Sequence, residues 1–119
     1  MDKSQAIHSF WNTFLTAYDQ NTVEEGLQFP YITYEVATSP QDEVALTASL
    51  WYKSNSWEDI SKKSDEISKY IGMGGKLLKT NDGYVWIKRA TPFSQRMSDE
   101  NDSIRRIVLT IYAEFLEEN

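Results

Sequence analysis

Few residues in this chain could do chemistry, because it contains one histidine and no cysteine. Without cysteine it cannot form a disulfide, offer a thiolate nucleophile or hold zinc through sulfur. To act as a general base, His8 would need an orienting acid and a nucleophile, and the sequence shows neither in a recognisable arrangement. A lone helical histidine is more often at the surface or partly packed, so we expect no catalytic role for His8.

The glycine-rich segment 72–76 has some features of a phosphate-binding loop. That motif needs a glycine five places before the Gly-Lys pair and a Ser or Thr after the lysine. Those positions hold Tyr70 and Leu77, so the motif fails at both ends. We interpret the segment as the end of a helix followed by a strand.

Several acidic residues are adjacent in the sequence, among them Asp42-Glu43, Glu58-Asp59, Asp65-Glu66 and Asp99-Glu100, with Asp102 near the last pair. Neighbouring side chains diverge on strands and on helices, so such pairs rarely form a shared site. The Asp99–Asp102 cluster lacks the glycine of a calcium-binding loop and has Thr110 where that loop requires glutamate. We therefore expect no catalytic, cofactor-binding or metal-binding residues, and an enzyme that uses carboxylates is the least favoured alternative.

The length and the net charge of the chain restrict the possible number of domains and the possible partners. The 119 residues fit a single domain spanning 1–119, and the net charge is −6. Proteins contact the phosphates of nucleic acid through clustered Lys and Arg side chains. The excess of acidic over basic residues therefore argues against binding of nucleic acid over a broad surface. The amino terminus does not resemble a signal peptide, and no apolar run approaches the roughly 20 residues of a membrane helix. We expect a soluble protein made in a reducing cytoplasm, with no membrane partner.

Apolar spacing predicts the elements of the first half. Between Ser4 and Tyr18, apolar residues recur at spacings of three and four, which predicts an amphipathic helix with Ser4 as its N-cap. Alternation then predicts a strand over 31–38, a turn over 39–42 and a second strand over 43–53.

The second half begins with another helix and hairpin. The sequence Ser56-Trp57-Glu58-Asp59 resembles a capping box and predicts a helix start, and Gly72 suits the position just past its end. Strands over 76–80 and 84–90 flank Asn81-Asp82-Gly83, because Asp-Gly suits a hairpin turn.

The last part of the chain is harder to interpret. The polar stretch Thr91–Ser103 predicts a long loop. Segment 104–116 fits both a strand and a helix, and its β-branched residues favour the strand. The expected fold is α+β, in the order α-β-β-α-β-β-β, a mostly antiparallel sheet with two helices packed on one face.

Basic and aromatic side chains are the candidates for contacts with other proteins. Arg105 and Arg106 would face opposite ways on a strand, so only one could serve a given surface. We expect ionic contacts to another subunit. Tryptophans are enriched among interface hot spots, but the sequence does not indicate which of Trp51, Trp57 and Trp86 would act in this way.

The order of features resembles the small tail terminator (tail completion) proteins of long-tailed bacteriophages and prophages. An amphipathic helix is followed by six segments that carry this resemblance: Pro30-Tyr31-Ile32-Thr33-Tyr34, Trp51-Tyr52, Ser56-Trp57-Glu58-Asp59, Tyr84-Val85-Trp86-Ile87-Lys88-Arg89, Pro92-Phe93-Ser94-Gln95-Arg96 and Ile104-Arg105-Arg106-Ile107-Val108-Leu109. The likeness spans about Phe29 to Phe115.

The resemblance implies a structural protein rather than an enzyme. Such proteins form a homo-hexameric ring on the tail tube, stop its growth and join the tail to the head. It implies self-association, partners in the tail-tube and head-completion (connector) proteins, and a place at the head–tail interface of a virion assembled in the bacterial cytoplasm. A negative ring lumen would not grip passing DNA. The expected interface residues are Phe93, Gln95, Arg96, Met97, Arg105 and Arg106.

Two alternatives stay open. The first is another phage neck or head–tail connector protein, because such proteins share this size and architecture. The second is a small bacterial ligand-binding or immunity-type module.

Overall fold

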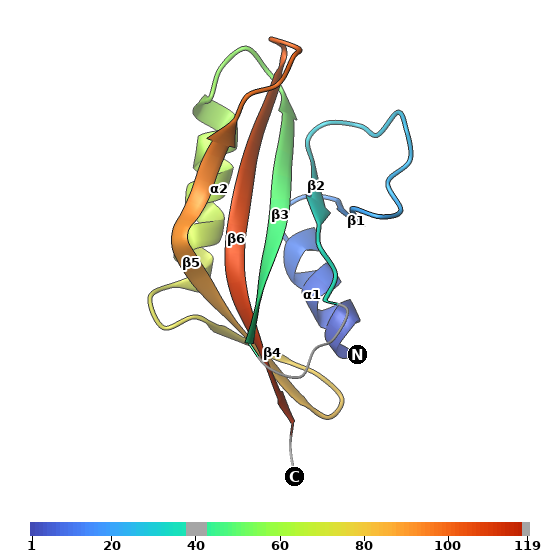
Figure 1. The fold of residues 1–119 in the computed structure, drawn as a ribbon, viewed down its shortest axis with the longest axis vertical. Helices are drawn as coiled ribbons and strands as arrows, with labels where there is room; N and C mark the ends of the chain where they lie inside the picture. The colour runs from blue at the N-terminus through green and yellow to red at the C-terminus, as the bar shows by residue number, and fades with distance from the viewer. Residues whose placement is uncertain (38–42, 118–119) are drawn as a thin grey trace.

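The computed structural model describes residues 1–37 and 43–117, which form two helices and six strands (Figure 1). In chain order the elements are α1 (Lys3–Asn12), β1 (Ala17–Asp19), β2 (Tyr31–Tyr34), β3 (Glu43–Lys53), α2 (Glu58–Ile71), β4 (Lys76–Lys79), β5 (Gly83–Met97) and β6 (Ile104–Glu117). The strands form one sheet in the order β1-β2-β3-β6-β5-β4. All pairs are antiparallel except β1 with β2. The predicted α+β fold is confirmed, with β1 as an additional strand.

Both helices cover the same face of the sheet (Figure 1). Because successive side chains of a strand point to opposite faces, the odd-numbered residues of β6 from Ile107 to Phe115 lie on the face under the helices and are buried. From the helices, the core includes Phe10 and Trp11 on α1 and Ile67 on α2. The other face of the sheet has no helix over it in the described chain.

Helix α1 differs from the prediction at both ends. Its N-cap is Asp2, not Ser4, and the Asp2 carboxylate accepts from the Gln5 backbone N–H at 2.8 Å while the Gln5 side chain accepts from the Asp2 N–H. The helix ends at Asn12 instead of continuing to Tyr18. Residues 17–19 pair with β2, so a contact with a distant strand overrides the local helical spacing.

Helix α2 begins without the predicted capping box. Trp57 occupies the N-cap position and has no side-chain cap, while Ser56 Oγ accepts from the Glu58 N–H at 3.1 Å. Glu58 and Asp59 lie in the first turn, where their negative charges interact favourably with the positive end of the helix dipole. The helix ends at Ile71, and Gly72 is its C-cap, as predicted. The φ of Gly72 is +74°, which favours glycine, but its ψ of 178° lies outside the left-handed helical region that the sequence predicted.

The largest correction concerns the loop predicted over 91–103. Strand β5 continues to Met97, and Ser94–Met97 pair with residues 109–106 of β6 after an irregularity between Arg89 and Ser94. Pro92 lies within this irregularity, as expected for proline in an edge strand. Only residues 98–103 connect β5 to β6.

Segment 104–116 is a strand, as its composition favours. Strand β6 runs antiparallel to all eleven residues of β3 and also pairs with β5. The predicted hairpin of 76–80 and 84–90 is confirmed. The first predicted strand, 31–38, is observed as Tyr31–Tyr34, and the predicted turn over 39–42 lies outside the described residues.

Candidate interaction surface

The sheet face opposite the helices carries aromatic, aliphatic and charged side chains. On β6 these are the even-numbered residues, of which Tyr112 is 38% exposed and Leu116 is 36% exposed. Cross-strand neighbours point to the same face, so Trp51 of β3 lies beside Arg106, and Trp86 of β5 beside Glu114. We call this surface the open face.

Trp51 is the centre of one cluster on the open face. Its ring is stacked on Tyr31 with centroids 6.1 Å apart, and its indole N–H donates to Thr33 Oγ1 at 2.9 Å. The Arg106 guanidinium lies 4.7 Å from the Trp51 ring centroid and donates from Nε to Ser49 Oγ at 3.1 Å. The cation–π contact and the two hydrogen bonds therefore set how the Trp51 ring and the Arg106 guanidinium lie on the open face.

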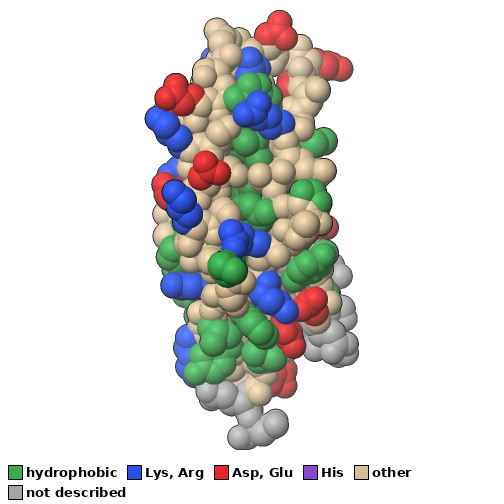
Figure 2. Space-filling view, turned by 90° about the vertical axis from the view of Figure 1, so that its left-hand side faces the viewer, with side chains coloured by type: hydrophobic (Ala, Val, Ile, Leu, Met, Phe, Trp, Pro, Cys, Tyr) green, Lys and Arg blue, Asp and Glu red, His purple; other side chains and the backbone are tan. Residues whose placement is uncertain are grey.

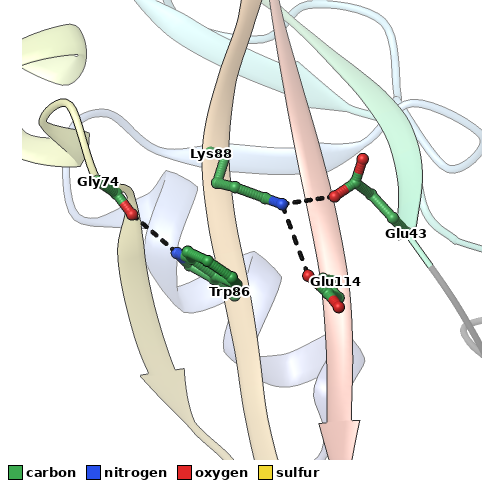
Figure 3. A network of polar contacts seen from close by, with 5 residues as sticks. All are labelled: Glu43, Gly74, Trp86, Lys88 and Glu114. Carbon is green, nitrogen blue, oxygen red and sulfur yellow. Dashed lines mark hydrogen bonds and ion pairs between the residues drawn. The ribbon is translucent and has the colours of Figure 1, made fainter.

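Lys88 is the centre of a second cluster, drawn in Figure 3. Its ammonium lies 2.5 Å from Glu43 Oε2 and 3.5 Å from Glu114 Oε2, and 4.4 Å from the Trp86 ring centroid. The Trp86 indole N–H donates to the Gly74 carbonyl at 2.9 Å. The hydrogen bond to Glu43, with the negative charges of Glu43 and Glu114, raises the pKa of Lys88 against the opposing effect of desolvation.

A third cluster lies on the helix side of the sheet, around Trp57. The guanidinium carbons of Arg96 and Arg105 are 4.8 and 5.3 Å from its ring centroid. Arg105 also donates to the carbonyls of Asn55 and Asp102, each at 2.8 Å. The two arginines therefore bind Trp57 at the end of the sheet where α2 begins.

The six predicted interface residues do not form one surface. Gln95, Met97 and Arg106 lie on the open face, as their cross-strand partners show. Arg96 and Arg105 lie on the helix side around Trp57, and Phe93 packs against the core. The prediction that Arg105 and Arg106 face opposite ways is confirmed, while their role at an interface stays a prediction.

His8 lies on the outer part of α1. Its Nδ1 is 2.9 Å from the Tyr34 hydroxyl, and the two rings are tilted by 52°. Burial, and secondly the negative charge of Asp19, raise the pKa of Tyr34, so its hydroxyl keeps its proton. A neutral phenol neither orients a histidine as a carboxylate does nor serves as an activated nucleophile.

Two other classes of site have no counterpart in the described residues. Among residues 1–37 and 43–117, no group of three or more His, Cys, Asp or Glu side chains could hold a metal ion. No helix in the same ranges is long and apolar enough to cross a membrane.

Sequence reasoning did not single out Lys88, Glu43 and Glu114 as one cluster, and it left the choice among the tryptophans open. The available signal was the alternation along β3 and β6, which places these side chains on one face. Their convergence also needed the strand order, in which β6 lies between β3 and β5.

Comparison with known proteins gave a fold match. No protein-family model and no curated protein matches the chain. A chain from the solved structure of the "virion of native gene transfer agent (GTA) particle" superposes with a TM-score of 0.64. It is 14% identical, and the match covers 95% of this chain and 93% of that chain. The two chains share a fold from end to end.

Proposed function

We propose that this chain is a structural protein of a phage-like virion. The observation that carries the proposal is the end-to-end likeness to a chain of a gene transfer agent virion, with coverage of 95% and 93%. The nearly complete coverage of both chains means that the shared fold accounts for almost the whole of each chain. Fold alone does not determine function, so the proposal also rests on the surface of this chain.

Within that role, we assign the chain to the end of the tail tube, as a tail terminator. It would form a ring on the last ring of the tube, stop further growth and present a surface to the head connector. Two features support this: the order of sequence features resembles that family, and the open face offers broad contact chemistry. Exposed Tyr112 and Leu116, with Arg106 held over Trp51, provide apolar and cationic groups of the kind enriched at protein interfaces.

The proposed activity is assembly rather than catalysis. The polar side chains that converge on the open face form ion pairs, cation–π contacts and hydrogen bonds with one another. Another protein could make further contacts of the same kinds with them. Replacing His8 with Gln should accordingly leave assembly intact, and loss of assembly by a stably folded His8→Gln protein contradicts this part of the proposal.

Deletion of the gene in the cells that carry it tests the proposal. Particle production is induced, and particles are examined by electron microscopy with and without a complementing copy. A tail terminator predicts overlong tails and heads without tails, both reversed by complementation. Tails of normal length with unjoined heads indicate a connector protein instead. Normal joined particles from the deletion strain contradict a virion role.

A further inference from the structure

Charge is divided unevenly along the chain. From Ser4 to Tyr52 there is no lysine or arginine, while six acidic residues account for the whole net charge of −6. The remaining twelve acidic residues are balanced by twelve basic ones. Because β1 and β2 form one edge of the sheet and β5 and β4 the other, the fold converts this division into a difference between two sides of the molecule.

The acidic side is the loop between β1 and β2. Figure 1 shows this loop projecting from the side of the molecule opposite β5 and α2. Glu24 and Glu25 are exposed there, next to Val23, which is 40% exposed. Within the described chain, neither glutamate forms an ion pair. The loop thus presents two unneutralised carboxylates together with an exposed apolar side chain.

The opposite side holds a hollow at the outer edge of β5. It opens where β4 stops pairing, since β4 pairs only with residues 84–87, and where β5 is irregular around Pro92. Lys88 and Arg89 line the hollow with apolar groups from Met73, Phe93 and Tyr112. Figure 2 looks onto this side and shows Lys and Arg side chains along much of its length, with Asp and Glu side chains among them and hydrophobic side chains gathered near the lower end.

Arg89 provides a positive charge in this hollow. Its guanidinium donates to Ser68 Oγ of α2 at 2.8 Å, and it forms no ion pair with a carboxylate of residues 1–37 or 43–117. A guanidinium has five N–H donors and stays charged, so most of its capacity to bind a carboxylate is unused. Met73, which is 98% exposed, provides an apolar group on the rim.

We infer that the hollow at the edge of β5 binds the 23–27 loop of a second copy of this chain. Glu24 and Glu25 would bind Arg89, and Val23 would pack on Met73. Three observations favour a second copy as the occupant: the charges are complementary, both surfaces carry an exposed apolar group, and the two lie on opposite sides of one molecule. The inference rests on the proposed ring for its biological use, but the contact exists or fails independently of the virion.

The geometry of the contact has a consequence for assembly. Each copy uses two different surfaces, so the contact is head-to-tail, and a bound pair leaves one surface of each kind free. Such contacts close into a ring when the rotation between neighbours allows it. A symmetric dimer would instead need one surface that is complementary to itself.

Complementary charge reversals test the contact. One variant carries Arg89→Glu and the other carries Glu24→Lys with Glu25→Lys. Each alone places like charges in the contact and should weaken self-association at least about tenfold at low salt, measured by sedimentation velocity and native mass spectrometry. An equimolar mixture restores opposite charges at both kinds of contact, so it should assemble into species containing equal numbers of the two variants.

Controls separate this contact from general effects of charge and folding. Asp99→Lys with Glu100→Lys makes the same charge change in the loop between β5 and β6 and should leave association unchanged. Met73→Glu changes a fully exposed side chain, so it should weaken association with no change in the circular dichroism spectrum, even where Arg89→Glu fails to fold. Raising the salt from about 0.05 to about 0.5 M should weaken wild-type association, because screening acts on exposed charges.

Several outcomes overturn the inference. They are a wild-type chain that stays monomeric at all concentrations, a mixture of the two variants that assembles no better than either alone, or an unaffected Met73→Glu protein. None of these depends on the deletion experiment. Overlong tails after gene deletion combined with a failed charge test would leave the proposed function standing and reject this contact, and the reverse pair of results would do the opposite.

Discussion

Glu43 on β3 and Glu114 on β6 lie directly opposite one another in the sheet, and both reach the ammonium of Lys88 on β5. Two like charges at directly opposed positions destabilise a strand pair unless something neutralises them. Lys88 therefore stabilises the pairing of β3 with β6 although it belongs to neither strand. Figure 3 shows this arrangement beside Trp86.

Replacing Lys88 with Met should lower the free energy of unfolding, because Glu43 and Glu114 are then left facing each other. Urea unfolding monitored by tryptophan fluorescence measures the change. Adding Glu114→Gln to the Lys88→Met protein should recover part of the loss, since the repulsion is removed. If the double variant is no more stable than Lys88→Met, the opposed glutamates are not the cause.

The stabilisation from Lys88 should also depend on pH. The pKa of Lys88 is raised in the folded protein, so its contribution is fully present below the ordinary lysine pKa of about 10.4 and is lost as pH rises through the raised value. Burial raises the pKa of Tyr31 with the same sign, but that effect is common to both proteins being compared. The stability difference between wild type and Lys88→Met should be constant from neutral pH to about pH 9 and shrink above it. A difference that grows at high pH contradicts the assignment.

Gly83 should not tolerate alanine. A Cβ at this position would lie 2.0 Å from the Leu116 carbonyl oxygen, which belongs to the backbone of β6 and cannot move without disturbing the strand pair. We expect a loss of about 2 kcal/mol in the free energy of unfolding, as for other overpacked sites. Gly74 is the matched control because a Cβ added there would have nothing within 4 Å of it. Gly74→Ala should change the stability by less than about 0.5 kcal/mol, and equal losses at the two glycines would contradict the packing argument.

Phe93 and Met97 should behave differently when truncated. Phe93 packs against the core, whereas Met97 is 40% exposed on the open face. Phe93→Ala should lower the free energy of unfolding by about 2 kcal/mol, and Met97→Ala by less than about 0.5 kcal/mol. The assignment of Phe93 to the core fails if its truncation is as mild as that of Met97.

Much of the fold could be predicted from the sequence because strongly alternating strands carry their own signal. Residues 43–53 and 104–116 alternate with period two, and that period alone places Arg105 and Arg106 on opposite faces. The Asp82-Gly83 dipeptide marks its hairpin by local backbone preference. The expectation of no enzymatic role rests on the lone His8, the absence of cysteine and the acidic pairs, and it stays a prediction.

Only the tertiary structure decided where α1 ends and where β5 ends. The spacing up to Tyr18 suits a helix, but residues 17–19 pair with β2, and that partner lies outside any local window. Residues 91–97 lie at the exposed edge of the sheet, so few of their side chains need to be apolar. Their polar composition therefore predicted a loop although they belong to a strand. The Lys88 cluster and the two charged sides likewise depend on strand order. Local periodicity determines which face a side chain takes, whereas long-range pairing determines its neighbours.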